Sequence, residues 1–290
     1  MSDSTTLAAE ELVRRIAPRG TWCSLRIVRI TKESFSVRDD VLLPPSSCED
    51  FGAMVTVVDG EEMGLAATSD LSEAGLYQAA RVAQEWARAC AGKGLLDFSA
   101  APRPLQSGSW VHPVEQPWES CARSTIIDRI RNACGNLKTD ERIVRRVASL
   151  GRVRTETALA TTDGIQIEQC HERLIPWLQA VAANDEDVQA RTNGGRSDAQ
   201  LGGLEVLDLV GFDELPEQIG NGAIETLLAP VCPTGVMDAV IGPAQMVLQV
   251  HESIGHALEL DRILGDERNY AGTSFVKTDD FGSLRWGPEI

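Results

Sequence analysis

The sequence has no surplus of basic residues. Its 290 residues include 27 lysines and arginines against 43 aspartates and glutamates, so the net charge is −16. Binding to a phosphate backbone is driven by lysine and arginine, and a chain of this composition lacks that drive. We therefore expect no direct binding to nucleic acid.

Long apolar runs are absent as well. Residues 1–11 are polar and acidic, with neither the basic start nor the apolar core of a signal peptide. An apolar stretch at residues 239–250 is interrupted by Gly242, Pro243 and Gln249, and it is shorter than the roughly 20 residues of a membrane-spanning helix. We expect a protein without a membrane partner.

Paired cysteines are also missing. The seven cysteines are odd in number and scattered along the chain, and no two of them form a CxxC pair. This usage fits reduced thiols in a cytoplasmic protein better than a disulfide framework. We therefore predict a cytoplasmic location.

The apolar pattern in the first third of the chain predicts an α+β fold. Residues 5–17 suit an amphipathic helix, and residues 22–30 and 33–38 suit strands. The turn Asp59-Gly60 predicts a hairpin between residues 51–58 and 63–68. Ser72 is a candidate N-cap for a helix at 73–91. Residues 1–97 are thus predicted to form an N-terminal helix–strands–helix domain.

Four prolines interrupt this pattern at residues 98–117, which predicts a linker or surface crossing where two domains meet. A middle region at 118–230 follows, with a helix at 118–134, a strand meander at 142–190 and a helix at 214–228. A buried strand at 236–241 is expected next. It opens the last predicted region, residues 231–290. The prolines of the 98–117 stretch are Pro102, Pro104, Pro113 and Pro117.

Chemistry is suggested by residues 246–260, which read MVLQVHESIGHALEL and contain an HExxxH motif. Two neutral imidazoles, His251 and His256, can bind Zn²⁺, and the neighbouring carboxylate of Glu252 can deprotonate water. When two residues of a regular α-helix lie five positions apart, the second side chain points about 140° away from the first. Both rings reach one ion only if the helix is widened, as in a π turn, and Gly255 would resist that least.

Histidines outside this motif are weaker candidates. Two histidines and a glutamate also occur by chance, but half of the four histidines lie here, on a helix that is apolar upstream. In Cys170-His171-Glu172, adjacent strand residues point to opposite faces, so Cys170 and His171 are not expected to share an ion. His112, next to Pro113, is expected to be solvated.

Several segments of the sequence resemble the TldD/PmbA family of metalloproteases, once described as modulators of DNA gyrase. The segment HESIGHALELDRILGDERNYAGTSFV is similar to that family's metal-binding helix and the part that follows it. Similar stretches lie at residues 37–83, 156–169 and 233–252, so the resemblance covers nearly the whole chain. It is more specific than HExxxH alone.

The resemblance implies a zinc peptidase that cuts unstructured or partly unfolded peptides by Glu-assisted attack of metal-bound water. It implies that His251 and His256 are zinc ligands and that Glu252 is the general base, with Glu259 or Asp261 as supporting acids around the ligands. The family's third ligand is a cysteine in a C-terminal domain, and no cysteine follows Cys232. The resemblance therefore implies that residues 231–290 are the start of a truncated metal-binding catalytic domain and that the chain is a fragment or a naturally short relative.

Three alternatives remain open. The chain could be a catalytically incomplete fragment or a partner subunit with a binding role, because family members form homodimers or heterodimers with a paralogous subunit. It could be an unrelated HExxxH peptidase of the dipeptidyl-peptidase III type, although no second acidic helix follows His256. A regulator that binds nucleic acid or gyrase is disfavoured by the charge of −16.

Overall fold

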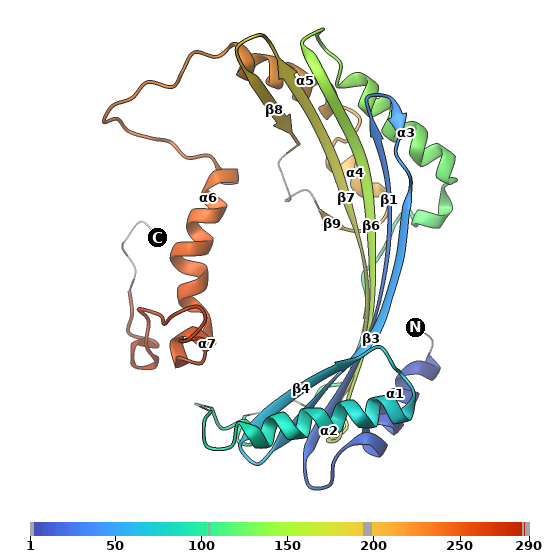
Figure 1. Cartoon of the computed structure of the whole chain (residues 1–290), viewed down its shortest axis with the longest axis vertical. Coiled ribbons are helices and arrows are strands. Elements are labelled where there is room, and N and C mark those ends of the chain that lie inside the picture. The colour runs from blue at the N-terminus through green and yellow to red at the C-terminus, as the bar shows by residue number, and fades with distance from the viewer. Residues whose placement is uncertain are drawn as a thin grey trace.

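The computed structural model describes residues 3–94, 96–101, 103, 105–193, 199–285 and 287. A long curved sheet runs through the molecule, with α3 (Arg123–Asn136) on one side and the segment that carries α6 (Pro243–Val250) and α7 (Leu260–Leu264) on the other (Figure 1). The first elements in the chain are α1 (Asp3–Ile16), β1 (Trp22–Arg38), β2 (Val41–Leu42), β3 (Ser46–Asp59), β4 (Glu62–Thr68) and α2 (Glu73–Ala89).

The middle of the chain completes the sheet and adds helices to it. Its elements are β5 (Gly108–Val111), the 3-10 turn η1 (Trp118–Ser120), α3 (Arg123–Asn136), β6 (Ile143–Thr161), β7 (Gln166–Ala183), β8 (Val188–Thr192), β9 (Gln200–Leu201), α4 (Glu205–Leu209) and α5 (Leu215–Leu228). The main path of the sheet has the order β4-β3-β1-β6-β7-β5. Among the described strands, only β5 pairs in parallel, with β7, whereas β2 extends β1, and β8 and β9 extend β7 in antiparallel fashion. The α+β class is confirmed.

Side chains alternate between the two faces of the sheet along the long strands. Leu25 is fully buried, whereas the next residue, Arg26, is exposed. Leu25 pairs with Val55 on β3 and with Ala160 on β6, and both of these are also fully buried. Directly opposed residues point to the same face of a sheet. We call the buried face the helix face and the opposite one the inner face.

Two hydrophobic cores lie on the helix face. One packs α1 and α2 against β1 and β3, and the other packs α3, α4 and α5 against β6 and β7. Charged residues occupy the helix face between them. Arg152 and Glu172 are almost fully buried there, 2.7 Å apart, and Arg152 also lies 2.8 Å from Glu119. Arg152, Glu172 and Glu119 are therefore paired within the fold.

The sequence signals of the first core are confirmed. Gly60 has φ of 68° in the turn between β3 and β4, a conformation that favours glycine. The Ser72 hydroxyl accepts a hydrogen bond from the Gly75 N–H, 3.1 Å away, and so caps α2. The predicted strands at 22–30 and 33–38 form one strand, β1.

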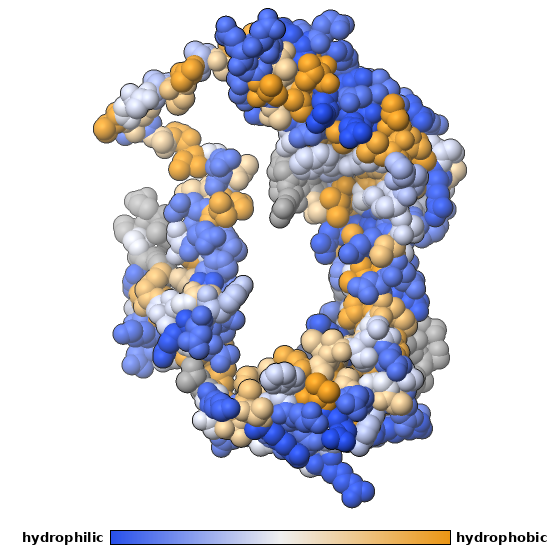
Figure 2. Space-filling model, in the orientation of Figure 1, coloured by the Kyte–Doolittle hydropathy of each residue, from blue (hydrophilic) through white to orange (hydrophobic). Residues whose placement is uncertain are grey.

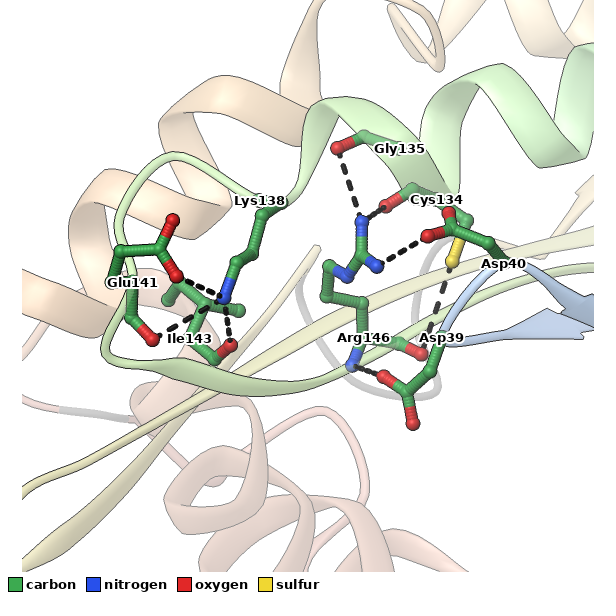
Figure 3. Close-up of polar contacts among 8 residues, drawn as sticks. All are labelled: Asp39, Asp40, Cys134, Gly135, Lys138, Glu141, Ile143 and Arg146. Atoms are coloured by element: carbon green, nitrogen blue, oxygen red, sulfur yellow. Dashed lines mark hydrogen bonds and ion pairs between the residues drawn. The ribbon is translucent and has the colours of Figure 1, made fainter.

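Arg146 connects three parts of the second core (Figure 3). Its guanidinium donates hydrogen bonds to the Asp40 carboxylate at 2.6 Å and to the Cys134 and Gly135 carbonyls near the end of α3. Its backbone N–H donates to the Asp39 carboxylate at 2.8 Å. A cation that satisfies carbonyls at a helix C-terminus stabilises that end of the helix. The β1–β2 turn is thereby attached to α3 and β6.

All seven cysteines are free thiols in the structure. Burial raises the pKa of the Cys23 thiol to about 12, so this residue is an inert part of the core at neutral pH. Cys48 and Cys232 are exposed. The expectation of reduced cysteines agrees with this geometry.

Three predicted elements differ from the structure. Residues 236–241 are irregular and exposed, so the prediction of a buried strand there is wrong. The helix expected at 118–134 is the short turn η1 followed by α3. The stretch at 98–117 contains β5 at the sheet edge, and Pro102 and Pro104 lie outside the described residues. Because β1, β6 and β7 run through both cores, the division at residues 98–117 stays a prediction.

We predict that Leu150→Ala lowers the free energy of unfolding by about 2–5 kcal/mol, because the substitution leaves a cavity in place of a fully buried β6 side chain. The control Val144→Ala removes methyl groups from an exposed residue near the end of the same strand and should cost less than about 1 kcal/mol. Urea unfolding measures both. Equal shifts for the two variants would contradict the assignment of the core.

Candidate functional site

The HExxxH motif lies on a composite helix in the last part of the chain. Its elements are α6 (Pro243–Val250), the π turn η3 (His251–Gly255), the 3-10 turn η4 (His256–Leu258) and α7 (Leu260–Leu264), with the 3-10 turn η5 (Thr278–Asp280) further on. Pro243 occupies the first turn of α6, where its missing N–H leaves no bond unmade. Gly265, at φ of 87°, ends α7 in the left-handed conformation.

The predicted widening of the helix is confirmed. The His256 N–H donates to the His251 carbonyl, a bond across five residues that replaces the usual bond across four. The two imidazole rings are therefore neighbours, with centroids 4.2 Å apart and planes at 69°. A Cβ at Gly255 would come no closer than 3.9 Å to the side chain of His251, so steric crowding does not require glycine there.

His251, Glu252 and His256 bring three possible ligand atoms together, all within 4.8 Å of one another. Among the described residues, this is the one group of three or more His, Cys, Asp or Glu side chains with that property. Two imidazoles suit Zn²⁺ and other first-row divalent ions, and the carboxylate beside them can accept a proton. The residues present therefore fit a divalent transition metal.

Glu259 supports the second imidazole. Its Oε1 lies 3.0 Å from Nδ1 of His256, and its Oε2 lies 2.9 Å from Nε of Arg262. The hydrogen bond with His256, helped by Arg262, holds the pKa of the Glu259 carboxyl below its usual range. A carboxylate that accepts from Nδ1–H leaves Nε2 of His256 free to bind a metal and orients the ring.

Asp261 has a local role in the structure. Its carboxylate accepts a hydrogen bond from the Arg262 N–H at 2.8 Å, in the first turn of α7. No contact between Asp261 and either imidazole occurs among the described residues. Of the two acids named as possible supports, Glu259 is the one that contacts a candidate ligand.

The motif is held mainly by contacts with the loop that follows it. The Ser274 hydroxyl donates to the Ala257 carbonyl at 2.5 Å, the Arg262 guanidinium donates to the Ala271 carbonyl at 3.3 Å, and Val276 is buried. Residues 228–253 upstream are exposed throughout. The exposed Cys232 does not join the group of three.

The remaining histidines lie together on the sheet. Glu172 points to the helix face, where it pairs with Arg152, whereas His171 points to the inner face. His112 is half-buried rather than solvated. Its ring lies 5.6 Å from that of Trp110, and its backbone N–H donates to the Cys170 carbonyl. Trp110 also lies 6.5 Å from the ring of His171.

Residues 23–87 match a domain family described as PmbA/TldA metallopeptidase domain 1. The chain is 22% identical over 304 residues to a metalloprotease of Methanocaldococcus jannaschii, an alignment that covers 96% of this chain and 64% of that protein. It is 25% identical to a metalloprotease TldD homolog of Haemophilus influenzae, covering 79% of this chain and 48% of that protein.

Solved structures with the same fold include a proposed modulator of a DNA gyrase from Thermotoga maritima, with a TM-score of 0.56 and 14% identity. That match covers 81% of this chain and 50% of the other. A second neighbour, TldE from Thermococcus kodakarensis, has a TM-score of 0.50 and 14% identity over 76% of this chain and 47% of its own. This chain thus spans between about half and two thirds of these relatives. None of the helices in the described residues is long and apolar enough to cross a membrane.

We predict that Glu259→Ala weakens Zn²⁺ binding about 10- to 100-fold, because the His256 ring loses the partner that orients it. Competition with a chromophoric chelator measures the dissociation constant. The control Asp266→Asn removes one negative charge from an exposed residue of the same segment and should leave binding unchanged. Equal affinities for wild type and Glu259→Ala would show that the contact does not support a ligand.

Proposed function

Because the chain belongs to the PmbA/TldD family, we propose that it carries the metal-binding helix of a zinc-dependent peptidase. The observation that supports this most directly is the π turn, which places His251, Glu252 and His256 within reach of one ion. A spacing of five on a regular α-helix would separate the rings. The widened turn is thus the feature that would allow both imidazoles to bind the same ion.

Each residue of the group has a distinct task in the proposed reaction. Nε2 of His256 and the imidazole of His251 would hold the ion. A bound Zn²⁺ ion would supply Lewis acidity, which polarises a peptide carbonyl and makes water acidic enough to lose a proton near neutral pH. Glu252 accepts the proton of the attacking water and then donates it to the departing amine, as a general base and general acid.

Unstructured or partly unfolded peptides are the proposed substrates. A peptide bond must approach the motif closely, and an extended chain presents its carbonyls more readily than a folded protein does. The motif helix borders an open space between the C-terminal segment and the sheet (Figure 2). An extended chain can enter a space of this kind.

Two imidazoles leave the ion short of protein ligands, because zinc sites normally use three or four. We propose that activity belongs to a longer protein or an assembly that supplies the third ligand. The second candidate function is therefore that this chain acts as a binding subunit, a reading favoured by the exposure of residues 228–253. Zinc content of the purified chain distinguishes a metal-holding subunit from a binding one.

A second subunit, either a copy of this chain or a paralogue, is the proposed partner. The side chains of Val231, Val236 and Val240 are almost fully exposed. Several exposed apolar side chains on one segment favour its burial at an interface. We expect light scattering to give a mass of two chains, for the chain alone or when mixed with a paralogue. A monomeric mass in both cases would remove this part of the proposal.

We predict that Glu252→Gln keeps zinc bound and lowers peptide cleavage by roughly 10²-fold or more, because the amide cannot accept the proton. His251→Ala should lose zinc and cleavage together. The measurement uses the full-length protein with an unfolded peptide and follows zinc content and turnover in parallel, with Asp266→Asn as the charge-matched control. Wild-type turnover by Glu252→Gln would exclude Glu252 as the base.

A further inference from the structure

The inner face of the sheet has a charge opposite to that of the chain as a whole. The register places Lys32 of β1, Val153 of β6 and Arg173 of β7 in one row across three neighbouring strands. Strands lie about 4.8 Å apart, so the two cations are separated by about 10 Å along this row. Arg26 lies on the same face of β1, six residues from Lys32.

These three cations are exposed. Among the described residues, Arg26, Lys32 and Arg173 form no ion pair. Two cations of the helix face, Arg152 and Arg154, differ from them in that both pair with carboxylates. In a chain with a net charge of −16, unpaired cations on one sheet face are a local reversal of charge.

Carboxylates are almost absent from this face. At the inner-face positions of β1, β3, β6 and β7, all of them described, Asp50 is the one acidic residue, and it pairs with Ile30 in the register. The inner-face positions of β6 and β7 carry no acid. A field of one sign on a surface attracts groups of the other sign.

The centre of the inner face also offers apolar and aromatic contacts. Half-buried Val153 lies between Lys32 and Arg173. His171 lies two residues before Arg173 on the same strand, and Trp110 lies beside it on β5. The pKa of the His171 imidazole is lowered by burial and by the neighbouring Arg173 and His112. The positive charge at the centre of the inner face at neutral pH therefore comes from Lys32 and Arg173.

From this arrangement we infer that the inner face binds acidic, extended polypeptide segments and so selects acidic peptides as substrates. The inference rests on the proposed peptidase function for its choice of a peptide as the ligand. Carboxylates on alternate residues of an extended peptide repeat every 6–7 Å, a spacing that long lysine and arginine side chains about 10 Å apart can follow. The face is turned toward the open space beside the motif helix, where an extended chain has room (Figures 1 and 2).

The test measures binding without cleavage. A fluorescein-labelled twelve-residue Gly/Ser peptide with four glutamates at alternate positions is titrated with the chain in chelator at low salt, and anisotropy gives the Kd. The same peptide with four glutamines is the neutral probe. We expect the glutamate peptide to bind about tenfold more tightly, and the preference to shrink as salt screens it.

The double variant Lys32→Gln/Arg173→Gln should abolish the preference. The control Arg81→Gln/Arg131→Gln removes the same charge from exposed helix residues and should retain it. Charge reversal in Lys32→Glu/Arg173→Glu should shift the preference to a lysine peptide, which tests the inference even if the neutral variant folds poorly. Equal Kd values for the glutamate and glutamine peptides, or an unchanged preference in the double variant, would overturn it.

Two further outcomes separate this inference from the proposed peptidase function. A preference for the glutamate peptide in a protein whose turnover is unaffected by Glu252→Gln would overturn the proposed mechanism and leave the inner face as an acidic-peptide surface. Equal binding of the glutamate and glutamine peptides, together with cleavage that requires Glu252, would overturn the inference about the inner face and leave the proposed peptidase mechanism in place. Tighter binding of a single-stranded oligonucleotide of equal charge would assign the face to nucleic acid and overturn the inference.

Discussion

The register of β1, β6 and β7 is the constraint on which most of this structure depends. Strand residues alternate between faces, so a shift of one residue would exchange the helix face for the inner face. The buried leucines and alanines of the helix face require the observed register, because only then do they meet α1, α2 and α3. The same register necessarily aligns Lys32 and Arg173 on the opposite face. Core packing thus determines the surface chemistry.

At the HExxxH motif, local helix geometry rather than strand register determines which side chains come together. A π turn aligns residues five apart, and the 3-10 turn that follows it eclipses residues three apart. The first turn brings His256 to His251, and the second brings Glu259 to His256. Arg262, three residues further, then pairs with Glu259. A change of helix type at each step therefore builds the candidate ligand pair and its supporting contacts from one continuous segment.

Local sequence signals were sufficient where the deciding interactions are local. The Asp59-Gly60 turn, the Ser72 cap and the widened helix each depend on residues within a few positions, and each was predictable. Residues 236–241 have the composition of a strand, but they pair with no strand in the described part of the chain, and strand formation requires a partner. The cationic row could not be predicted, because Lys32 and Arg173 are 141 positions apart and meet only through the register.

The proposed peptide selection and the proposed chemistry belong to different parts of the chain. The inner face belongs to a sheet whose other face is packed by the two hydrophobic cores, whereas the motif belongs to a segment whose upstream residues 228–253 are exposed. A peptide held by the sheet through charge would gain affinity from contacts remote from its scissile bond. Binding energy of that kind assists the reaction only if it places the bond near Glu252. In the proposed reaction, the inner face would therefore assist catalysis only if the motif helix is held at a fixed position relative to it, and the proposed third metal ligand is the contact best suited to fix that position.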